Sequence, residues 1–327
     1  MGGDFAPNSE VLGAIDAASE KPDTLELYLV GKESLIKDLL KERNAFLENI
    51  KVVDAPDVIS MEDSPTDTHK SKPNSSMNVA INLVKDRKAD GAISAGNTGA
   101  FTANSILKLG RIPGVGRPTI GALFPTDKGT SLLCDVGAFV DCRANHLYEF
   151  GVMGSIYMSH IFRIDKPKIG LLNVGEEKSK GNEVTIEAYK LLENSKLNFI
   201  GNVEGSDLLN AKSDIVLCDG FTGNILLKFG ESFVWLMKSK LIHMTEEGFF
   251  KKLWVGLISK TMRNLVGGFD YQKHGGVPLL GVNGVCIVGH GKSSPLAIKN
   301  MIFRAEEMVS KEINKAIEEY LKLNPLN

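Results

Sequence analysis

Three loops rich in glycine, asparagine and hydroxyl residues follow short apolar stretches of the sequence. They span 94–100 (SAGNTGA), 175–183 (GEEKSKGNE) and 219–224 (DGFTGN). Each loop stands between a stretch typical of a β-strand and a stretch typical of a helix. Backbone N–H groups at the start of a helix attract anions, and small residues let a phosphate approach the backbone. The loops are therefore candidate phosphate sites, and glycine-rich helix caps without a ligand are the alternative.

Two of these loops also carry side chains suited to stabilising an oxyanion. The Asn224 amide can donate to a developing negative charge, and the Thr222 hydroxyl can contact a substrate. The alternative is that Asp219 simply caps the helix that follows, since Asp is a common N-cap residue. Lys178 and Lys180 offer positive charge in the second loop, where a solvated surface turn explains the same letters.

Common motifs of nucleotide, metal and nucleophile sites are missing from the sequence. The loop 288–294 (VGHGKSS) fails the Walker spacing and lacks the third glycine of the dinucleotide fingerprint. There is no G-x-S-x-G or H-E-x-x-H, the six histidines are scattered, and the four cysteines have no C-x-x-C spacing. We therefore predict no metal, no cofactor and no disulfide framework, with cysteines that are buried rather than nucleophilic.

The elements that must position these loops alternate along the chain. Predicted strands cover 25–30, 50–53, 91–94, 119–124, 131–134, 168–174, 198–201 and 215–218. Predicted helices cover 34–43, 75–88, 98–109, 144–162, 183–192, 221–240 and 295 to about 323. Such alternation indicates βαβ units in a mostly parallel sheet with helices on both faces, where ligands bind beyond the carboxyl ends of the strands. We expect one α/β domain over 1–327, a mobile loop at 61–73, and a buried strand and turn at 276–289.

Composition narrows the class of protein. The 327 residues carry 38 Lys and Arg against 40 Asp and Glu, and 43% of them are hydrophobic, so the chain is globular rather than disordered. A net charge of −2 argues against general affinity for nucleic acid. No signal peptide or membrane-spanning stretch is predicted, and we expect a cytoplasmic protein.

A predicted helical hairpin at about 228–268 differs from the rest of the chain. Between 228 and 273, eight Lys and Arg face four Asp and Glu, a local charge of +4. Apolar side chains at roughly helical spacing indicate a core or dimer interface. Large apolar residues flanked by lysines also describe a helix lying in a membrane surface, and the two readings are compatible. The candidate membrane contacts are Phe249, Phe250, Leu253, Trp254 and Leu257.

Seven segments together resemble the bacterial phosphate acyltransferase family, PlsX. They are MGGDFAP at 1–7, SAGNTGA at 94–100, CDVGA at 134–138, LLNVGEEKSKGNE at 171–183, FIGNVEG at 199–205, CDGFTGN at 218–224 and GGVPLLGVNGVCIVGHG at 275–291. The resemblance runs through the chain in order. It implies a Rossmann-like α/β/α sandwich, related to phosphotransacetylases and isocitrate dehydrogenases, with the hairpin inserted.

The resemblance also implies an activity and partners. The enzyme would move a fatty acyl group from acyl carrier protein to inorganic phosphate, and the acyl phosphate would serve a membrane glycerol-3-phosphate acyltransferase in phospholipid synthesis. The resemblance also implies a protein that is usually a homodimer and that associates peripherally with the membrane. Because the carrier is acidic, its expected docking residues are Lys251, Lys252, Lys260 and Arg263.

Roles for individual residues follow from this implied reaction. Phosphate is already an oxyanion nucleophile and a thiolate is a good leaving group, so binding, orientation and oxyanion stabilisation are what the enzyme must supply. We expect Lys180 to carry charge for phosphate or the oxyanion, and Asn224 to donate to the oxyanion. The expected phosphate and substrate contacts are Ser94, Gly96, Asn97, Thr98, Gly99, Ser75, Ser76, Thr222 and His290.

The chain departs from the family pattern at two places. The family begins with a short apolar strand before the Met-Gly-Gly-Asp segment, which here starts at Met1, so a gap in the sheet is expected. Phe139 stands where the family commonly has Asn. Alternative functions are a phosphotransacylase of the same fold that uses coenzyme A thioesters, a dehydrogenase of that fold, and a non-catalytic scaffold that binds carrier protein and membrane.

Overall fold

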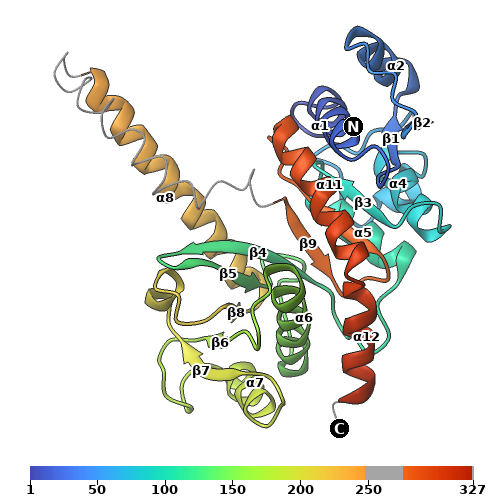
Figure 1. Ribbon diagram of the computed structural model, residues 1–327. Coiled ribbons are helices and arrows are strands. Elements are labelled where there is room, and N and C mark those ends of the chain that lie inside the picture. The colour runs from blue at the N-terminus through green and yellow to red at the C-terminus, as the bar shows by residue number, and fades with distance from the viewer. Residues whose placement is uncertain (247–274, 326–327) are drawn as a thin grey trace. The chain divides into compact units, whose positions relative to one another are not determined.

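The computed structural model describes residues 1–246 and 275–325. The chain divides into two compact units, and strands alternate with helices in both (Figure 1). Unit 1 comprises Met1–Gly121, Val152–Asp165 and Gln272–Asn327, and unit 2 comprises Ala122–Gly151 and Lys166–Tyr271. The predicted α/β class with a central sheet and flanking helices is confirmed. One catalytic domain over the whole chain stays a prediction.

Unit 1 contains a two-stranded parallel sheet and part of a larger mixed sheet. The first pairs β1 (Leu27–Gly31) with β2 (Ile50–Asp54), and the second has the order β3-β10-β9-β4. These strands are β3 (Gly91–Ser94), β10 (Val285–Val288), β9 (Val277–Leu280) and the beginning of β4 (Thr119–Thr126). The β3–β10 pair is parallel, whereas β9 is antiparallel to both neighbours. The prediction of strand and turn at 276–289 is confirmed by β9 and β10.

The helices of unit 1 include two that lie side by side in Figure 1, α1 and α11. The helices are α1 (Asn8–Glu20), α2 (Glu33–Glu42), α3 (Thr68–Ser71), α4 (Ser76–Lys85), α5 (Thr98–Leu109), α11 (Pro295–Ser310) and α12 (Ile313–Leu323). The buried face of α1 consists largely of small residues, including Ala14, Ala17 and Ala18, which lets α11 approach closely. The predicted single helix from 295 to 323 is wrong, because Glu312 adopts a left-handed conformation between α11 and α12.

Unit 2 is built on a parallel sheet whose neighbouring strands are β5, β8, β6 and β7, with β4 beside β5. The strands are β5 (Gly129–Cys134), β6 (Ile169–Leu172), β7 (Phe199–Val203) and β8 (Ile215–Leu217). The helices are α7 (Glu183–Glu193), η1 (Gly205–Leu209), α8 (Gly220–Glu246) and the first part of α6 (Ala144–Phe162). Leu132, Ile169 and Ile215 are completely buried, as expected for strands covered on both faces. The predicted hairpin at 228–268 falls within the described residues only along α8.

Side-chain caps fix where several helices begin after a strand or loop. The side chains of Ser75, Asn97, Asn182 and Ser294 accept backbone N–H groups at the starts of α4, α5, α7 and α11. An N-cap of this type stabilises a helix by about 1 kcal/mol. Some of the polar residues that the sequence suggests as ligands, such as Ser75 and Asn97, therefore also cap helices.

Candidate active site

Three segments of unit 1 meet at the carboxyl ends of β3 and β10: the loop after β3, the loop after β10 and the first residues of the chain. The N–H of Gly289 donates to the carbonyl of Ser94 at 2.7 Å, and the N–H of Asp4 donates to the carbonyl of Gly291 at 2.8 Å. The first residues of the chain thus lie against both strand ends. The loop residues expected to contact phosphate here are Ser94, Gly96, Asn97, Thr98, Gly99 and His290.

Asn97 holds this part of unit 1 together through both ends of its amide. Its Oδ1 accepts the N–H of Ala100 at 3.0 Å, which caps α5. Its Nδ2 donates to the carbonyls of Ser60, Met61 and Asp63 at 3.1, 3.3 and 3.2 Å. The side chain is buried. Asn97 therefore has a structural role, whichever ligand the loop binds.

The three serines expected at the phosphate site also make contacts within the protein. The Ser94 hydroxyl accepts the N–H of Gly96 at 3.2 Å, and the Ser75 hydroxyl accepts the N–H of Asn78 at 3.3 Å. The Ser76 hydroxyl accepts the amino group of Met1 at 3.2 Å. Ser75 and Ser76 are buried. Among the expected phosphate contacts of this unit, Thr98, Gly99 and His290 are the exposed ones.

The segment 61–73, predicted to be a mobile loop, contains a short helix and several specific contacts. It contains the short helix α3, and the Lys72 ammonium contacts the Asp63 carboxylate at 2.6 Å. The hydrogen bond from Lys72, assisted by the backbone N–H of Ser60, lowers the pKa of Asp63. The Asn78 amide donates to the carbonyls of Thr68 and Lys72 at 3.0 and 2.8 Å. The polar composition of 61–73 does not reveal these specific contacts.

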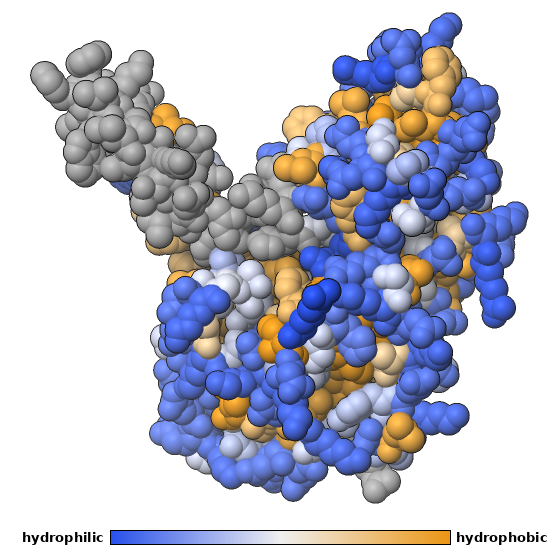
Figure 2. All heavy atoms as spheres, viewed as in Figure 1, coloured by the Kyte–Doolittle hydropathy of each residue, from blue (hydrophilic) through white to orange (hydrophobic). Residues whose placement is uncertain are grey.

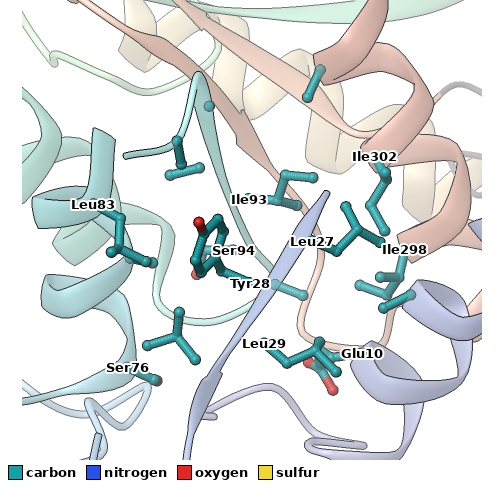
Figure 3. Close-up of a pocket in the computed structure, with 18 of the residues that line it drawn as sticks. Glu10, Leu27, Tyr28, Leu29, Ser76, Leu83, Ile93, Ser94, Ile298 and Ile302 are labelled. Carbon is teal, nitrogen blue, oxygen red and sulfur yellow. The ribbon is translucent and has the colours of Figure 1, made fainter. Parts of the chain in front are cut away.

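A cavity of about 720 Å³ lies in unit 1, between β1 and β3 (Figure 3). Its labelled walls come from β1, β3, α1, α4 and α11 and include Leu27, Tyr28, Leu29, Ile93, Ser94, Glu10, Ser76, Leu83, Ile298 and Ile302. Both strands are edges of their sheets. A five-residue strand between two layers fills about 800 Å³, at ~3.3 Å per residue, ~4.8 Å between strands and ~10 Å between layers. The cavity is therefore comparable in size to one five-residue strand.

The proposed catalytic pair belongs to unit 2, where β5, β8 and β6 run parallel. Lys180 lies in the loop from β6 to α7, and Asn224 lies in the first turn of α8, which follows β8. Because β6 and β8 are parallel neighbours, the two loops that follow them lie at the same end of the sheet, beyond the carboxyl ends of the strands. Thr222 lies in the same turn of α8.

The loop that carries Lys180 is fixed by two asparagines that sequence reasoning missed. The Asn173 amide donates to the carbonyl of Lys180 at 2.9 Å, and the buried Asn202 amide donates to the carbonyl of Glu177 at 2.9 Å. Gly181 has φ +100°, and a Cβ there would lie 2.2 Å from the Thr185 hydroxyl. Asn173 lies in the LLNVGEE segment and Asn202 in the FIGNVEG segment. The sequence of these segments does not show which backbone groups of the loop their amides bind.

Lys180 itself is exposed, and no ion pair of its ammonium is found in the part of the chain that the structure describes. Its neighbour Lys178 pairs with Glu193, whereas Lys212 pairs with Glu176 and Asp207. A cation without an internal partner is available to an anionic ligand. This distinguishes Lys180 from the other lysine of its loop.

Asn224 is exposed and is held against the loop that follows β5. A Cβ on Gly137 would lie 3.6 Å from the Cβ and Cγ of Asn224, and a Cβ on Gly223 would lie 1.9 Å from the carbonyl oxygen of Asp135. The Asp135 carboxylate is fully buried and accepts the N–H of Phe139 at 3.0 Å. The loop therefore packs directly on the start of α8.

Asp219 caps α8, as the simpler reading of the sequence proposes. Its carboxylate accepts the N–H of Thr222 at 2.7 Å and the Thr222 hydroxyl at 2.9 Å. Burial, followed by the nearby carboxylates of Asp219 and Asp135, raises the pKa of the Cys218 thiol well above its usual value. Since the thiolate is the nucleophilic form, Cys218 is unsuited to covalent catalysis.

The expected carrier-docking residues Lys251, Lys252, Lys260 and Arg263 lie outside the described residues. So do the expected membrane contacts Phe249, Phe250, Leu253, Trp254 and Leu257. Hydrophobic residues show at a few places beside α8 in Figure 2, and the exposed apolar side chains of this helix include Phe229 and Trp235. Among the helices that the structure describes, none is long and apolar enough to cross a bilayer. Within the same residues, no cluster of His, Cys, Asp or Glu suits a metal ion.

Solved structures with a similar fold include two phosphotransacetylases. The EutD phosphotransacetylase from Staphylococcus aureus has a TM-score of 0.60 and 16% identity, covering 93% of this chain and 92% of that chain. A phosphotransacetylase from Streptococcus pyogenes has a TM-score of 0.62 and 16% identity over the same shares of both chains. At this identity the similarity establishes the fold, which is the expected α/β/α sandwich.

Sequence relatives establish the family. A family model described as fatty acid synthesis protein matches residues 1–316. The phosphate acyltransferase of Chlorobaculum tepidum is 44% identical over 330 residues, which cover 98% of this chain and 100% of the relative. That of a Nostoc species is 41% identical, covering 97% of this chain and 93% of the relative. The chain therefore belongs to the phosphate acyltransferase family of fatty acid synthesis proteins and is an acyltransferase.

Proposed function

We propose that the protein transfers a fatty acyl group from the thioester of acyl carrier protein to inorganic phosphate. A phosphate oxygen attacks the thioester carbonyl, the carbon–sulfur bond breaks, and the products are acyl phosphate and the carrier thiolate, which takes up a proton. The observation that carries this proposal is the exposed Lys180 ammonium on a fixed loop, at the same sheet edge as Asn224. Family membership supports the same reaction.

The reaction needs little acid–base help from the protein. Phosphate is already negative near neutral pH, and an ordinary thiol has a pKa of about 8.5, so the leaving thiolate is stable. In our proposal Lys180 attracts the phosphate or stabilises the oxyanion, and the Asn224 amide donates to the oxyanion. Loss of one such donor commonly lowers kcat by about 100- to 1,000-fold.

The Asn173 and Asn202 amides support this assignment, because they bond to backbone carbonyls of the loop and leave the Lys180 side chain exposed. For unit 1, we propose that phosphate contacts involve the first turn of α5, at Thr98 and Gly99, and His290. The other expected contacts there are proposed to position this turn rather than bind the ligand directly.

We further propose a cytoplasmic homodimer that associates peripherally with the membrane. Four apolar residues on α8 recur every fourth position and are each half exposed or more, as expected for a face that meets a partner. They are Phe221, Ile225, Phe229 and Phe233. Acyl phosphate is a lipid-soluble activated acid, and we propose that a membrane glycerol-3-phosphate acyltransferase consumes it toward phosphatidic acid.

The test is release of free thiol by the purified protein from acyl carrier protein thioester, with and without phosphate. We expect phosphate-dependent release, and release that does not depend on phosphate would contradict the proposal. The same assay with an acyl coenzyme A thioester tests the alternative that coenzyme A, rather than acyl carrier protein, carries the acyl group. Raising the salt concentration is expected to raise KM for the carrier more than KM for phosphate, because a basic surface binds an acidic partner.

A further inference from the structure

A second cavity, of about 470 Å³, lies entirely within unit 2. It is found beyond the carboxyl ends of β6 and β8, next to the first residues of α7 and α8 and to the segment before α6. Its apolar walls are formed mainly by Val140, Leu147, Leu171, Leu172, Val184 and Phe221. A cavity of this size falls in the range of small-molecule sites.

The polar side chains in its wall are largely paired with one another. Asn182 accepts the N–H of Thr185 at 2.9 Å, and the Thr185 hydroxyl donates to the carbonyl of Asn182 at 2.9 Å. Asp219 accepts both the N–H and the hydroxyl of Thr222. These pairs leave few donors for a polar ligand, and the Asp219 carboxylate opposes an anion. The wall therefore suits an uncharged, apolar occupant.

The cavity also adjoins both proposed catalytic residues along the chain. Asn182 lines it and stands two positions after Lys180, and Thr222 lines it and stands two positions before Asn224. The apolar space is thus bounded by the two loops that are proposed to act on the thioester carbonyl. An acyl chain attached to that carbonyl needs apolar surroundings close to these loops.

The larger cavity of unit 1 is less suited to a hydrocarbon chain. Its walls include the outer edges of β1 and β3, where alternate backbone N–H and C=O groups point away from the paired neighbour (Figure 3). An alkyl chain cannot hydrogen-bond to these groups, and burying them unpaired costs about 1–3 kcal/mol each. An extended backbone can satisfy them.

We propose that the cavity of unit 2 binds the hydrocarbon chain of the acyl donor and sets its length preference. The proposal rests on acyl transfer as the function of the chain. Val184, in the first turn of α7, and Leu172, at the end of β6, are half-buried and line the cavity, so they are the residues through which its size can be changed.

The experiment compares wild type, Val184→Trp and Leu209→Trp as full chains with octanoyl and palmitoyl thioesters of the same carrier. Leu209 is the matched control, because it belongs to the same unit, is 52% exposed and lies outside the cavity wall. Each methylene excluded from apolar surroundings costs about fourfold in binding. Because the indole displaces at least two methylenes, we expect kcat/KM of Val184→Trp to fall at least tenfold with palmitoyl and less than about threefold with octanoyl.

Leu172→Ala is the second variant, and we expect it to shift the preference toward longer chains because it enlarges the cavity. Fluorescence of methyl cis-parinarate, an uncharged ester, measures chain binding without turnover, and Val184→Trp is expected to weaken this binding at least tenfold. If wild type binds this probe, Val184→Trp binds it at least tenfold more weakly, and no phosphate-dependent thiol release occurs, the proposed function fails while the chain site stands. Unchanged length preference and probe binding in both cavity variants, or a rise in KM for phosphate alone, would overturn the proposal.

Discussion

The Asn97→Ala variant tests whether Asn97 has a structural role or binds phosphate. The substitution removes the cap on Ala100, which costs about 1 kcal/mol, and removes donors from three carbonyls of the loop at 60–63. Ser60 and Met61 are exposed, so water can replace the amide there, and we assign this loss about 1 kcal/mol. The expected local destabilisation is therefore about 2 kcal/mol.

Hydrogen exchange measures this loss directly, because local opening sets the protection of each amide. A cost of about 2 kcal/mol corresponds to roughly 30-fold faster exchange in the first turn of α5 and at 60–63. Asn97→Asp keeps an oxygen for the cap but removes the Nδ2 donor, so we expect faster exchange at 60–63 alone. Thr98→Ala, at an exposed neighbour, is expected to leave exchange unchanged. Unchanged exchange in Asn97→Ala together with a raised KM for phosphate would refute the structural role.

Three further predictions follow from burial, charge and the sheet edges. A five-residue apolar β-forming extension fused to the N-terminus is expected to raise the melting temperature by filling the cavity between β1 and β3, and the same extension with two prolines is not. Iodoacetamide is expected to alkylate half-buried Cys142 well before Cys218, whose thiol pKa is raised by burial, as peptide mapping can check; faster labelling of Cys218 would contradict this. Lys72 lowers the pKa of Asp63 in the folded protein. The ion pair therefore stabilises the 60–63 loop fully at pH values above the ordinary Asp pKa, and this stabilisation is lost as the pH falls through the lowered pKa. Proteolysis of this loop is thus expected to increase on acidification in wild type and to lack that step in Asp63→Asn.

The elements with strong apolar patterns could be predicted from the sequence. The observed bounds of β3, α5 and α6 equal those predicted, because each is a clear strand or helix pattern bounded by loop residues. Helix α1 was missed because small residues such as Ala14 and Ala17 give its buried face a weak apolar pattern. The end of α11 was missed because the left-handed backbone at Glu312 has no glycine to mark it.

Site residues were harder to predict, because a helix cap and a ligand contact require the same residue types. Asn97 illustrates this, since its amide suits either a phosphate or four backbone groups, and only the fold shows the second set. Asn173 and Asn202 were missed because their partners are backbone carbonyls distant in the sequence or set by the turn at Gly181. Lys180 and Asn224 stay predictions that the loop geometry supports.

The central claim is tested most directly by trapping acyl phosphate with hydroxylamine in reactions of wild type, Lys180→Ala and Asn224→Ala. Lys178→Ala and Asn194→Ala are the matched controls, because Lys178 shares the loop but pairs with Glu193, and the Asn194 amide bonds to the end of α7. We expect phosphate-dependent acyl hydroxamate from wild type and both controls, and about 100-fold less or lower from the two catalytic variants with unchanged melting temperatures. Near-normal acyl hydroxamate from Lys180→Ala and Asn224→Ala would contradict the account.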